Sequence, residues 1–536
     1  MNDSVDILII GAGASGGALA WSLSDTSMNV LCMEQGDWIS PNDYPTNLKN
    51  YEQHRWDSDF SADPNERNKP EDYPVNSQES PITPLNYNAV GGGTIAYMGL
   101  MPRFHPSDFK IKSLDGVADD WPIDYSILEP YYSINDHMSG ISGLKGNPAY
   151  PPYSLPLPPL AMGKIGQTLA KGFNQLGWHW WIQDAAMLSQ NYKGRKACVY
   201  AGPCDLGCAT GSKASTDITY WPHALDNGVR LRTRCRVREI TIDKKGMANG
   251  VLYYNENDKL ERQKAKVVVL ACNGIGTPRI LLNSSSRIFP DGLANRSGLV
   301  GKNLMFHPLS AVLGIFDEPM EGGKGPTSCG IACHEFYESD PQRDFIGGYA
   351  IASGRGDGPL TFSLGGYGGD NPIPWGETHR ESFDSIYPYM APLVVVSDDF
   401  PEESNQVTLD PELMDSDGIP AAKVNYRQSD NNKKMIAHGK TRAKEALEAA
   451  GARELIEVEG VLRKAGWHLM GTARMGVDPG KSVVNSIGQC HDVKNLFIVD
   501  GSVFVTGAAV NPTPTIQAVA LYIGDQIKKH GKSILN

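Results

Sequence analysis

The amino-acid sequence predicts an α/β fold of two domains, one of which is inserted into the other. Two observations predict this fold class. A short apolar run, Val5–Ile10, precedes a glycine-rich turn and a helical pattern that begins near Ala14, and strand-length apolar runs return in the middle and near the end of the chain. The chain also has 536 residues, whereas a single hydrophobic core stops growing at about 250–300 residues. We therefore expect an α/β domain built from dispersed segments, with a second domain between them.

The first strand, turn and helix have the spacing of a dinucleotide-binding motif. Gly11, Gly13 and Gly16 form a GxGxxG pattern, in which small residues let the backbone approach a pyrophosphate at a helix N-terminus. The next run, NVLCMEQG, predicts a strand that ends at Glu34. An acidic side chain about 20 residues after the glycines binds ribose hydroxyl groups in such motifs. The alternative is a tight strand–helix turn without a ligand, but the strand, the helix and the acid together favour a dinucleotide.

The far end of the chain favours a flavin dinucleotide over a nicotinamide one. In NLFIVDGSVF, residues 495–504, a buried strand ends at Asp500 and Gly501, the pattern with which flavoproteins bring a late strand to the ribityl and phosphate part of the flavin. Between the two ends, a strand at Val267–Ala271 turns through Asn273 into a helix that suits the same sheet. We predict that the cofactor domain consists of residues 1–110, 191–312 and 455–536.

The remaining stretches, residues 111–190 and 313–454, are predicted to form the inserted domain. They are dense in proline and glycine, which predicts loops and edge strands in preference to linkers between independent domains. The run NNKKMIAHGKTRAKEALEAAGA predicts one amphipathic helix in the second stretch.

The composition excludes several classes of function. The net charge is −12 and no block of Lys and Arg is present, so a nucleic acid or an anionic lipid surface is not expected as a partner. No apolar run in the sequence approaches the length of about 18 residues that a membrane-spanning helix needs. The N-terminus carries an acid where a secretion signal has basic residues, and the nine cysteines are an odd number. We therefore expect a cytoplasmic chain without a disulfide framework.

Six motifs along nearly the whole chain are similar to those of one family. They are GAGASGG near the N-terminus, NAVGGGTIAYMG (88–99), DWPIDYSILEPYY (120–132), GLVGKNLMFHP (298–308), WHLMGTARMG (467–476) and NPTPTIQAVA (511–520). The chain thereby resembles the glucose-methanol-choline (GMC) oxidoreductases, flavoproteins that oxidise alcohols. The sequences and spacing of its motifs are most similar to those of the branch that contains gluconate, fructose and FAD-dependent glucose dehydrogenases. They are more distantly similar to those of pyranose oxidases. The resemblance implies a Rossmann-like FAD-binding domain interleaved with an α+β substrate-binding domain.

The resemblance also implies where FAD binds, and that it binds without a covalent link. Some relatives attach the flavin to a His that follows the glycines of NAVGGGTIAYMG, but here residues 94–97 are Thr, Ile, Ala and Tyr. Gly91, Gly92 and Gly93 are expected to pass close under the flavin ring. The other cofactor-binding positions that the resemblance implies are Ala14, Ser15, Thr94, Val237, Ala271, Asn511 and Thr513.

Two polar residues near the C-terminus are the candidates for catalysis. Oxidation of an alcohol needs a base for the hydroxyl proton, and His is the side chain whose pKa lies nearest neutrality. The resemblance implies that His468 is this base, that His468 and Asn511 flank the substrate hydroxyl, and that flavin N5 accepts the hydride. The alternative is a His packed against Trp467, with Asn511 as a helix cap. His307 lies before Pro308 in the LMFHP motif and is interpreted as a structural histidine, with contact to the substrate as the alternative. His105 is expected at the surface or at a domain junction.

The predicted reaction is oxidation of a hydroxyl group of a sugar, a sugar acid or a glycoside. The electrons are expected to pass to an acceptor, either a partner subunit or a small redox carrier. Two alternatives remain: an oxidase that uses oxygen, and a lyase or binding protein in which FAD is redox-silent. The Trp-rich run GWHWWIQDAA (177–186) is interpreted as core, with a sugar-stacking wall as the alternative.

Three cysteines, Cys198, Cys204 and Cys208, lie close together in the run ACVYAGPCDLGCATG. Their C-x5-C-x3-C spacing is similar to that with which the glucose and fructose dehydrogenase branch binds an iron–sulfur cluster, and three thiolates suit a [3Fe-4S] cluster. Cluster-free relatives, the cholesterol and long-chain alcohol oxidases, carry a similar turn before a G-x-K-x-S-T run, here residues 211–216. A cluster and a structural loop both remain open, and a disulfide is the third alternative.

Overall fold

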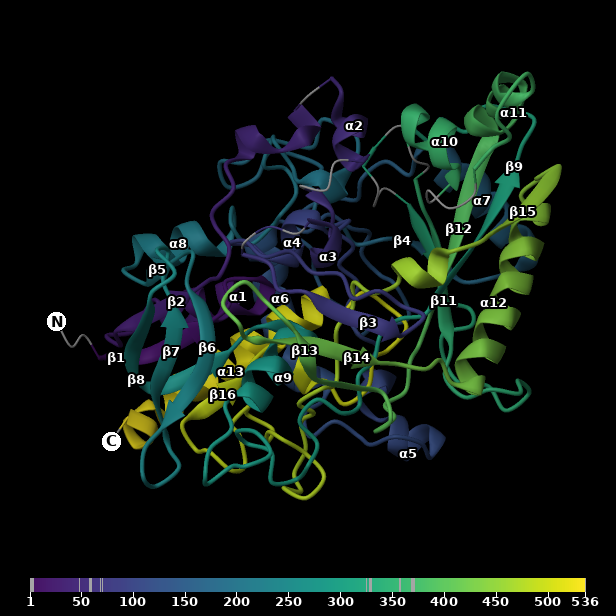
Figure 1. Cartoon of the computed structure of the whole chain (residues 1–536). Helices are drawn as coiled ribbons and strands as arrows, with labels where there is room; N and C mark the ends of the chain where they lie inside the picture. Colours follow the sequence, from purple (N-terminus) through teal and green to yellow (C-terminus); the bar gives the residue numbers. More distant parts are fainter. Residues whose placement is uncertain are drawn as a thin grey trace.

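The computed structural model describes residues 4–47, 49–56, 60–67, 69, 71–323, 325–326, 330–355, 358–367 and 372–535. Within them the chain forms a seven-stranded, mostly parallel sheet, a six-stranded antiparallel sheet and a three-stranded sheet (Figure 1), which confirms the predicted α/β class. None of the helices in these ranges is both long enough and apolar enough to cross a membrane. The helices are α1 (Ala14–Leu23), α2 (Tyr51–Trp56), α3 (Pro64–Arg67), α4 (Gly93–Ala96), α5 (Ile111–Asp115), α6 (Tyr125–Ser139), α7 (Gly163–Leu176), α8 (Tyr220–Asp226), α9 (Asn273–Asn283), α10 (Pro359–Gly365), α11 (His379–Ile386), α12 (Asp430–Ala449) and α13 (Thr513–Leu535).

The seven-stranded sheet is assembled from three distant parts of the chain. Its order is β5-β2-β1-β8-β7-β6, and β16 lies beside β8. Because β1, β2, β5, β8 and β16 are parallel, their carboxyl ends meet at one edge, where such sheets bind ligands. The strands are β1 (Val5–Ile10), β2 (Val30–Met33), β5 (Arg230–Arg232), β6 (Arg236–Ile242), β7 (Ala248–Tyr254), β8 (Leu260–Leu270) and β16 (Leu496–Ile498).

The predicted strand, turn and helix at the N-terminus are confirmed at both bounds, since β1 spans Val5–Ile10 and α1 begins at Ala14. Two other strands differ from prediction. Strand β8 begins at Leu260, because its first half pairs with β7 in a hairpin. This half is largely exposed and therefore shows no continuous apolar run. Strand β16 is short because the chain turns at Asp500, whose carboxylate accepts a hydrogen bond from the backbone N–H of Ser502.

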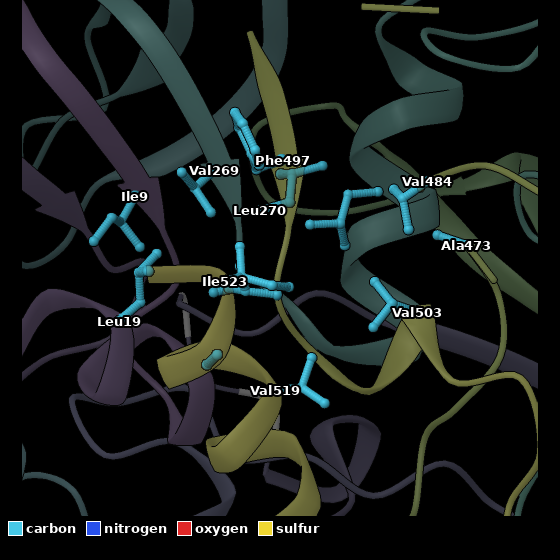
Figure 2. Packing of buried hydrophobic residues seen from close by; sticks show 14 of the residues in the cluster. Ile9, Leu19, Val269, Leu270, Ala473, Val484, Phe497, Val503, Val519 and Ile523 are labelled. Carbon is cyan, nitrogen blue, oxygen red and sulfur yellow. The ribbon is translucent and has the colours of Figure 1, made fainter. Parts of the chain in front are cut away.

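Helices α1 and α13 pack together on this sheet, and α6 packs on α13. Figure 2 shows Leu19 of α1 and Ile523 of α13 pointing toward Ile9 of β1 and Val269 of β8. All four side chains are fully buried. This core holds the first glycine turn and the start of α13 in fixed positions at the edge of the sheet.

The six-stranded sheet presents one face to helices and the other to a cavity. Its order is β15-β9-β12-β11-β10-β4, and α7 and α12 cover the helical face, along the right side of Figure 1. Residues alternate along each strand, so Ile351 and Val395 belong to the core under these helices, whereas their neighbours line the cavity. The strands are β4 (Trp180–Ile182), β9 (Leu309–Ile315), β10 (Ile331–Cys333), β11 (Tyr349–Ser353), β12 (Met390–Ser397) and β15 (Glu454–Val458).

The third sheet, in the order β13-β14-β3, lies between the other two in Figure 1. Tyr73 and Val407 belong to its core cluster, together with Ile275 of α9. The strands are β3 (Val75–Glu79), β13 (Gln406–Met414) and β14 (Pro420–Asn425).

The predicted domain boundaries do not follow the packing at every point. Helix α6 was assigned to the inserted domain, but Leu128 and Tyr132 on it are fully buried in the core of the first sheet. The boundary at 312 falls inside β9, and β15 pairs with β9 although residues from 455 onward were assigned to the cofactor domain. The expectation of edge strands in 313–454 is wrong for β12, which lies in the interior of its sheet and contains Pro392. Packing and hydrogen bonds between segments far apart in sequence decide where the domain boundaries lie and which strands are interior. Local composition cannot predict these long-range contacts.

Candidate active site

A cavity of about 1200 Å³ extends from the glycine turn before α1 to the six-stranded sheet. One end is lined by the carboxyl ends of β1 and β2, and the other by residues of β9, β10, β11 and β12. It therefore lies between the parallel sheet and the antiparallel sheet, at the edge where parallel α/β sheets bind ligands.

Two glycine turns shape the first end of the cavity. Gly11 has φ +98°, and a Cβ on it would lie 2.5 Å from the carbonyl oxygen of Ala271. Gly92 has φ +51°, and a Cβ on it would lie 2.8 Å from the Cα of Gly13. Any side chain at Gly11 or Gly92 would meet backbone, so only glycine lets the two turns approach each other this closely.

Glu34 lies directly after β2 and faces the same end of the cavity. Its carboxylate accepts hydrogen bonds from the backbone N–H of Ala12 at 2.8 Å and of Gly36 at 3.0 Å. Burial raises the pKa of Glu34, and these backbone donors act in the opposite direction. The carboxylate is therefore fixed in orientation at the cavity wall.

Most of the sequence-predicted cofactor positions line this one cavity, but two do not. Gly16 lies inside α1, where a Cβ would come 1.9 Å from the carbonyl oxygen of Gly11, and Gly91 faces Asp217 and Ile95. These two glycines allow close packing behind the turns, and their contact with the cofactor stays a prediction. The positions that line the cavity are Gly11, Gly13, Ala14, Ser15, Glu34, Gly92, Gly93, Thr94, Val237, Ala271, Asp500, Gly501, Asn511 and Thr513.

His468 meets a second histidine that the sequence did not pair with it. Met305 and Met470 form a β-bridge that joins two antiparallel segments. His307 lies two residues after Met305 and His468 two residues before Met470, so the two histidines face each other across the segments. Their Nδ1 atoms are 2.6 Å apart. His468 lines the cavity, whereas His307 is fully buried behind it.

The hydrogen bonds assign a proton position to each ring of this pair. A backbone carbonyl only accepts, so His307 donates its Nε2–H to the carbonyl oxygen of Gly507, at 3.0 Å. The Nδ1 of neutral His307 is then an acceptor, and His468 donates its Nδ1–H to it. This leaves the Nε2 of His468 as a lone pair on the cavity side, where the amide of Asn511 donates to it at 3.2 Å.

Both rings are neutral near neutral pH. Burial lowers the pKa of His307 to about 4. Burial first, and the neighbouring His307 second, lower the pKa of His468 well below its usual value. The geometry and the pKa shifts together give a base ready to accept one proton from a group in the cavity.

The opposite wall of the cavity is a largely apolar face of small side chains. Two polar side chains, His334 and Gln183, lie along one margin of it, and Trp181 lines the cavity beside them. The Nε1–H of Trp181 donates to the carbonyl oxygen of Leu144 at 2.7 Å, so the ring is held in place. The apolar residues of this wall are Leu309, Ala332, Ala350, Ala352, Val394 and Val396.

The sequence interpretation of the Trp-rich run is thus confirmed for two of its three tryptophans. Trp178 and Trp180 pack against the core under α7, and Trp181 alone of the three lines the cavity. His105 is not a surface residue: it is buried at the junction between two parts of the chain, where it contacts His334. No sequence signal paired His105 with His334, because their contact spans 229 positions.

The three-cysteine loop is held together by a buried lysine. Lys213 donates its Nζ hydrogens to the carbonyl oxygens of Ile95 at 2.6 Å, Tyr97 at 2.9 Å and Cys204 at 2.5 Å. Cys208 accepts a hydrogen bond from the backbone N–H of Lys213. Among the residues that the structure describes, no group of three or more His, Cys, Asp or Glu side chains is arranged to hold a metal ion. The structure therefore gives no support to the cluster.

We expect Lys213→Met to destabilise the protein by about 3 kcal/mol or more, because it leaves three buried carbonyl groups without their charged donor. The measurement is the urea midpoint of unfolding of the purified holoprotein. Lys164→Met is the matched control, since Lys164 pairs with Glu318 at the surface and such pairs contribute about 0–1 kcal/mol. Equal midpoints for the two variants would contradict the structural role of Lys213.

Comparison with known proteins identifies similar chains and a similar fold. A protein similar over the whole chain is the 2-methyl-1,2-propanediol dehydrogenase of Mycolicibacterium austroafricanum, 40% identical over 100% of this chain and 97% of the relative. The fructose dehydrogenase large subunit of Gluconobacter japonicus is 27% identical over 98% of each chain. The crystal structure of pyridoxine 4-oxidase from Mesorbium loti has the same fold, with a TM-score of 0.64 and 17% identity over 98% of this chain and 100% of that one.

Two family models, both described as GMC oxidoreductase, match residues 161–309 and 401–520. The second of these segments contains His468 and Asn511, and the first contains the three-cysteine loop and His307. The matches and the similarity of the diol dehydrogenase along the full length lead to one conclusion. The chain belongs to the GMC oxidoreductase family.

Proposed function

We propose that this protein oxidises a hydroxyl group of a small alcohol, with FAD bound without a covalent link and His468 as the base. The observation that carries the proposal is the unprotonated Nε2 of His468, which faces the cavity beside the amide of Asn511. Membership of the GMC oxidoreductase family supports the reaction class.

The residues at the first end of the cavity fit FAD. The turns at Gly11 and Gly92 have no room for a side chain, because a Cβ on either would strike backbone, and glycine turns of this kind let the backbone approach a pyrophosphate. The start of α1 provides backbone N–H groups for the same phosphates, and the fixed carboxylate of Glu34 suits a ribose. Asp500 and Thr513 line the same cavity and would also contact FAD.

In the proposed reaction the chain's own residues orient the alcohol and remove its proton. The substrate hydroxyl lies in the cavity beside both His468 and Asn511 and replaces the Asn511 amide as the partner of the His468 Nε2, toward which its proton points. His468 accepts that proton, and the amide of Asn511 donates a hydrogen bond to the substrate oxygen as negative charge develops on it. FAD, when bound, supplies the hydride acceptor. His307 holds the His468 ring by the Nδ1 contact throughout.

The cavity wall favours a small alcohol with an apolar body. Alanine and valine side chains of β10, β11 and β12 line the cavity opposite the first end, and such side chains offer no hydrogen-bond partners to the many hydroxyl groups of a sugar. The name of the 40% identical relative, a dehydrogenase of 2-methyl-1,2-propanediol, supports a branched diol. The predicted sugar, sugar acid or glycoside is the second candidate, which Trp181 at the wall favours as a stacking surface.

Anaerobic mixing of the yellow protein with a panel of alcohols tests the proposal. The panel contains 2-methyl-1,2-propanediol, 1,2-propanediol, fructose and gluconate, and the reading is loss of the visible flavin absorbance. We expect the diols to bleach the flavin at lower concentration than the sugars. Faster bleaching by fructose or gluconate would establish the second candidate, and no bleaching by any alcohol would favour a lyase or a binding protein.

We further propose that the electrons pass to a partner subunit or a small redox carrier, and that oxygen is the slower acceptor. The supporting observation is that the similar proteins include two dehydrogenases, one of which is named as the large subunit of a complex. Reoxidation of the bleached protein by a quinone should outpace reoxidation by air-saturated buffer. The opposite order would make the protein an oxidase.

We expect acid precipitation to release all of the flavin into the supernatant, because Thr94, Ala96 and Tyr97 occupy the cavity wall where some relatives carry a flavin-linking His. Flavin in the pellet would show a covalent bond.

The same preparation, purified without air, serves for iron analysis and electron paramagnetic resonance. Iron with a low-temperature signal would restore the cluster at Cys198, Cys204 and Cys208, in place of the loop held by Lys213.

A further inference from the structure

Two hydrogen-bonded pairs of histidines each place one ring at the same cavity, His468 in one pair and His334 in the other, and the two pairs have different end groups. His468 leads to His307 and then to the carbonyl oxygen of Gly507, which is buried and cannot take a proton. The second pair, His334 and His105, leads to a carboxylate at the surface. The first pair is therefore closed to proton exchange with solvent, and the second is open.

The second pair forms a continuous hydrogen-bonded chain. His334 follows β10 directly, and because side chains alternate, Ala332 and His334 line the cavity while Cys333 is buried in the core. The Nδ1 of His334 is 3.2 Å from the Nε2 of His105. The Nδ1 of His105 is in turn 3.0 Å from the Oε1 of Glu338, whose side chain is 59% exposed.

The surroundings of the chain hold it in line without interrupting it. The ring of His105 stacks on Tyr337, with centroids 3.8 Å apart, and Tyr150 meets its edge. Ser107 donates its hydroxyl to the same Oε1 of Glu338, at 2.9 Å. The other titratable groups that face this cluster are Asp108, which accepts from Tyr337, His179 beside His334, and Glu335, which accepts from the backbone of His179.

Every link of the chain both accepts and donates a proton. Each imidazole has two ring nitrogens and passes a proton from one to the other side, and the carboxylate accepts it at the end. On the proposed function, each reduction of FAD leaves the proton of the substrate hydroxyl on the base, inside a buried site. The electron pair leaves with the hydride. Where the final acceptor takes up electrons alone, as proposed above for a partner subunit, this proton must reach solvent separately before the base can act again.

We propose that His334, His105 and Glu338 form the outlet through which this proton leaves the active site. The substrate O–H bond breaks and its proton moves to the Nε2 of His468. The proton crosses the cavity through water to the Nε2 of His334, the Nδ1–H of His334 passes to His105, and the Nδ1–H of His105 passes to Glu338 and then to solvent. No electrons move along this chain. The inference rests on the proposed function, since that reaction supplies the proton.

The test follows two signals in one anaerobic mixing experiment with 2-methyl-1,2-propanediol in weakly buffered solution. Flavin absorbance reports hydride transfer, and a pH-indicator dye reports the proton that appears in solution. In the unaltered protein the two traces should coincide. In His105→Gln and in Glu338→Gln we expect the dye trace to fall behind the flavin trace by at least about tenfold, since a positioned proton-transfer group has been removed.

Two further variants sharpen the comparison. Glu318→Gln is the matched control, because Glu318 is an exposed carboxylate that pairs with Lys164 in another part of the surface, and its two traces should coincide. Glu338→Asp keeps the carboxylate and should recover part of the lost proton rate. A structural defect would slow both traces together, and this result would contradict the outlet, as would coincident traces in His105→Gln and Glu338→Gln. Absence of flavin bleaching in the unaltered protein with every alcohol of the panel would instead overturn the proposed function, and the outlet with it.

Discussion

His468→Ala is expected to keep FAD bound but to lower the rate constant of flavin reduction by about 10²-fold or more, as loss of a general base does. The Nε2 of His468 carries an unprotonated lone pair on the cavity side of the ring, because the hydrogen bond to His307 holds the proton on Nδ1. The amide of Asn511 is its neighbour. The measurement is anaerobic stopped-flow reduction at saturating diol, and the flavin spectrum gives the cofactor content of the same sample.

His491→Ala is the matched control for this variant. His491 contacts the hydroxyl of Ser482 at 2.9 Å, away from the cavity lining, so its removal should leave flavin reduction within about twofold, the size of a change of less than about 0.5 kcal/mol at an uninvolved site. Reduction of His468→Ala at the unaltered rate would remove His468 from its assigned role.

His307→Leu is expected to have the second largest effect, a fall of about 10²-fold in the rate constant of flavin reduction. His307 is fully buried behind the cavity and bonds to His468 through its Nδ1, so it acts as a positioning residue. Without its Nδ1 acceptor, His468 loses the partner that keeps the proton on its own Nδ1, and the ring is free to present Nε2–H to the substrate. A base in the wrong tautomer loses most of its activity, by up to about 10⁴-fold in a serine protease.

A conservative variant separates positioning from folding. In His307→Asn the side-chain oxygen takes the place of Nδ1 and accepts from His468, so we expect a rate between those of His307→Leu and the unaltered protein. Substrate affinity, read from the concentration dependence of reduction, should change little in both variants. Equal rates in His307→Leu and His307→Asn would contradict the tautomer argument.

Local patterns in the sequence predict the first strand, turn and helix closely, because strand, glycine turn and helix are decided by neighbours along the chain. The assignment of His468 and Asn511 came from their motifs, and both residues line the cavity. The partner of His468 was not predictable in this way. His307 lies 161 positions away, and only the pairing of Met305 with Met470 brings the two rings together.

The same reason explains what else the sequence did not contain. The sequence predicts His105 at the surface or at a domain junction; it is buried at a junction, and its partners His334 and Glu338 are more than two hundred positions away. The spacing of the three cysteines suggested a metal as readily as a loop. The nearby Lys213 in the G-x-K-x-S-T run was the signal for a loop, since its side chain binds carbonyl groups on both sides.

The pH dependence of flavin reduction tests the neutral His468–His307 pair most directly. The base acts only when unprotonated, so the rate constant falls where acid protonates it. Because burial and His307 lower the pKa of His468 well below its usual value, we predict that the rate constant at saturating diol stays constant from about pH 8 to about pH 6, across the range in which an unperturbed histidine titrates. A rate constant that falls with a midpoint at about pH 6.5 or above would contradict the account.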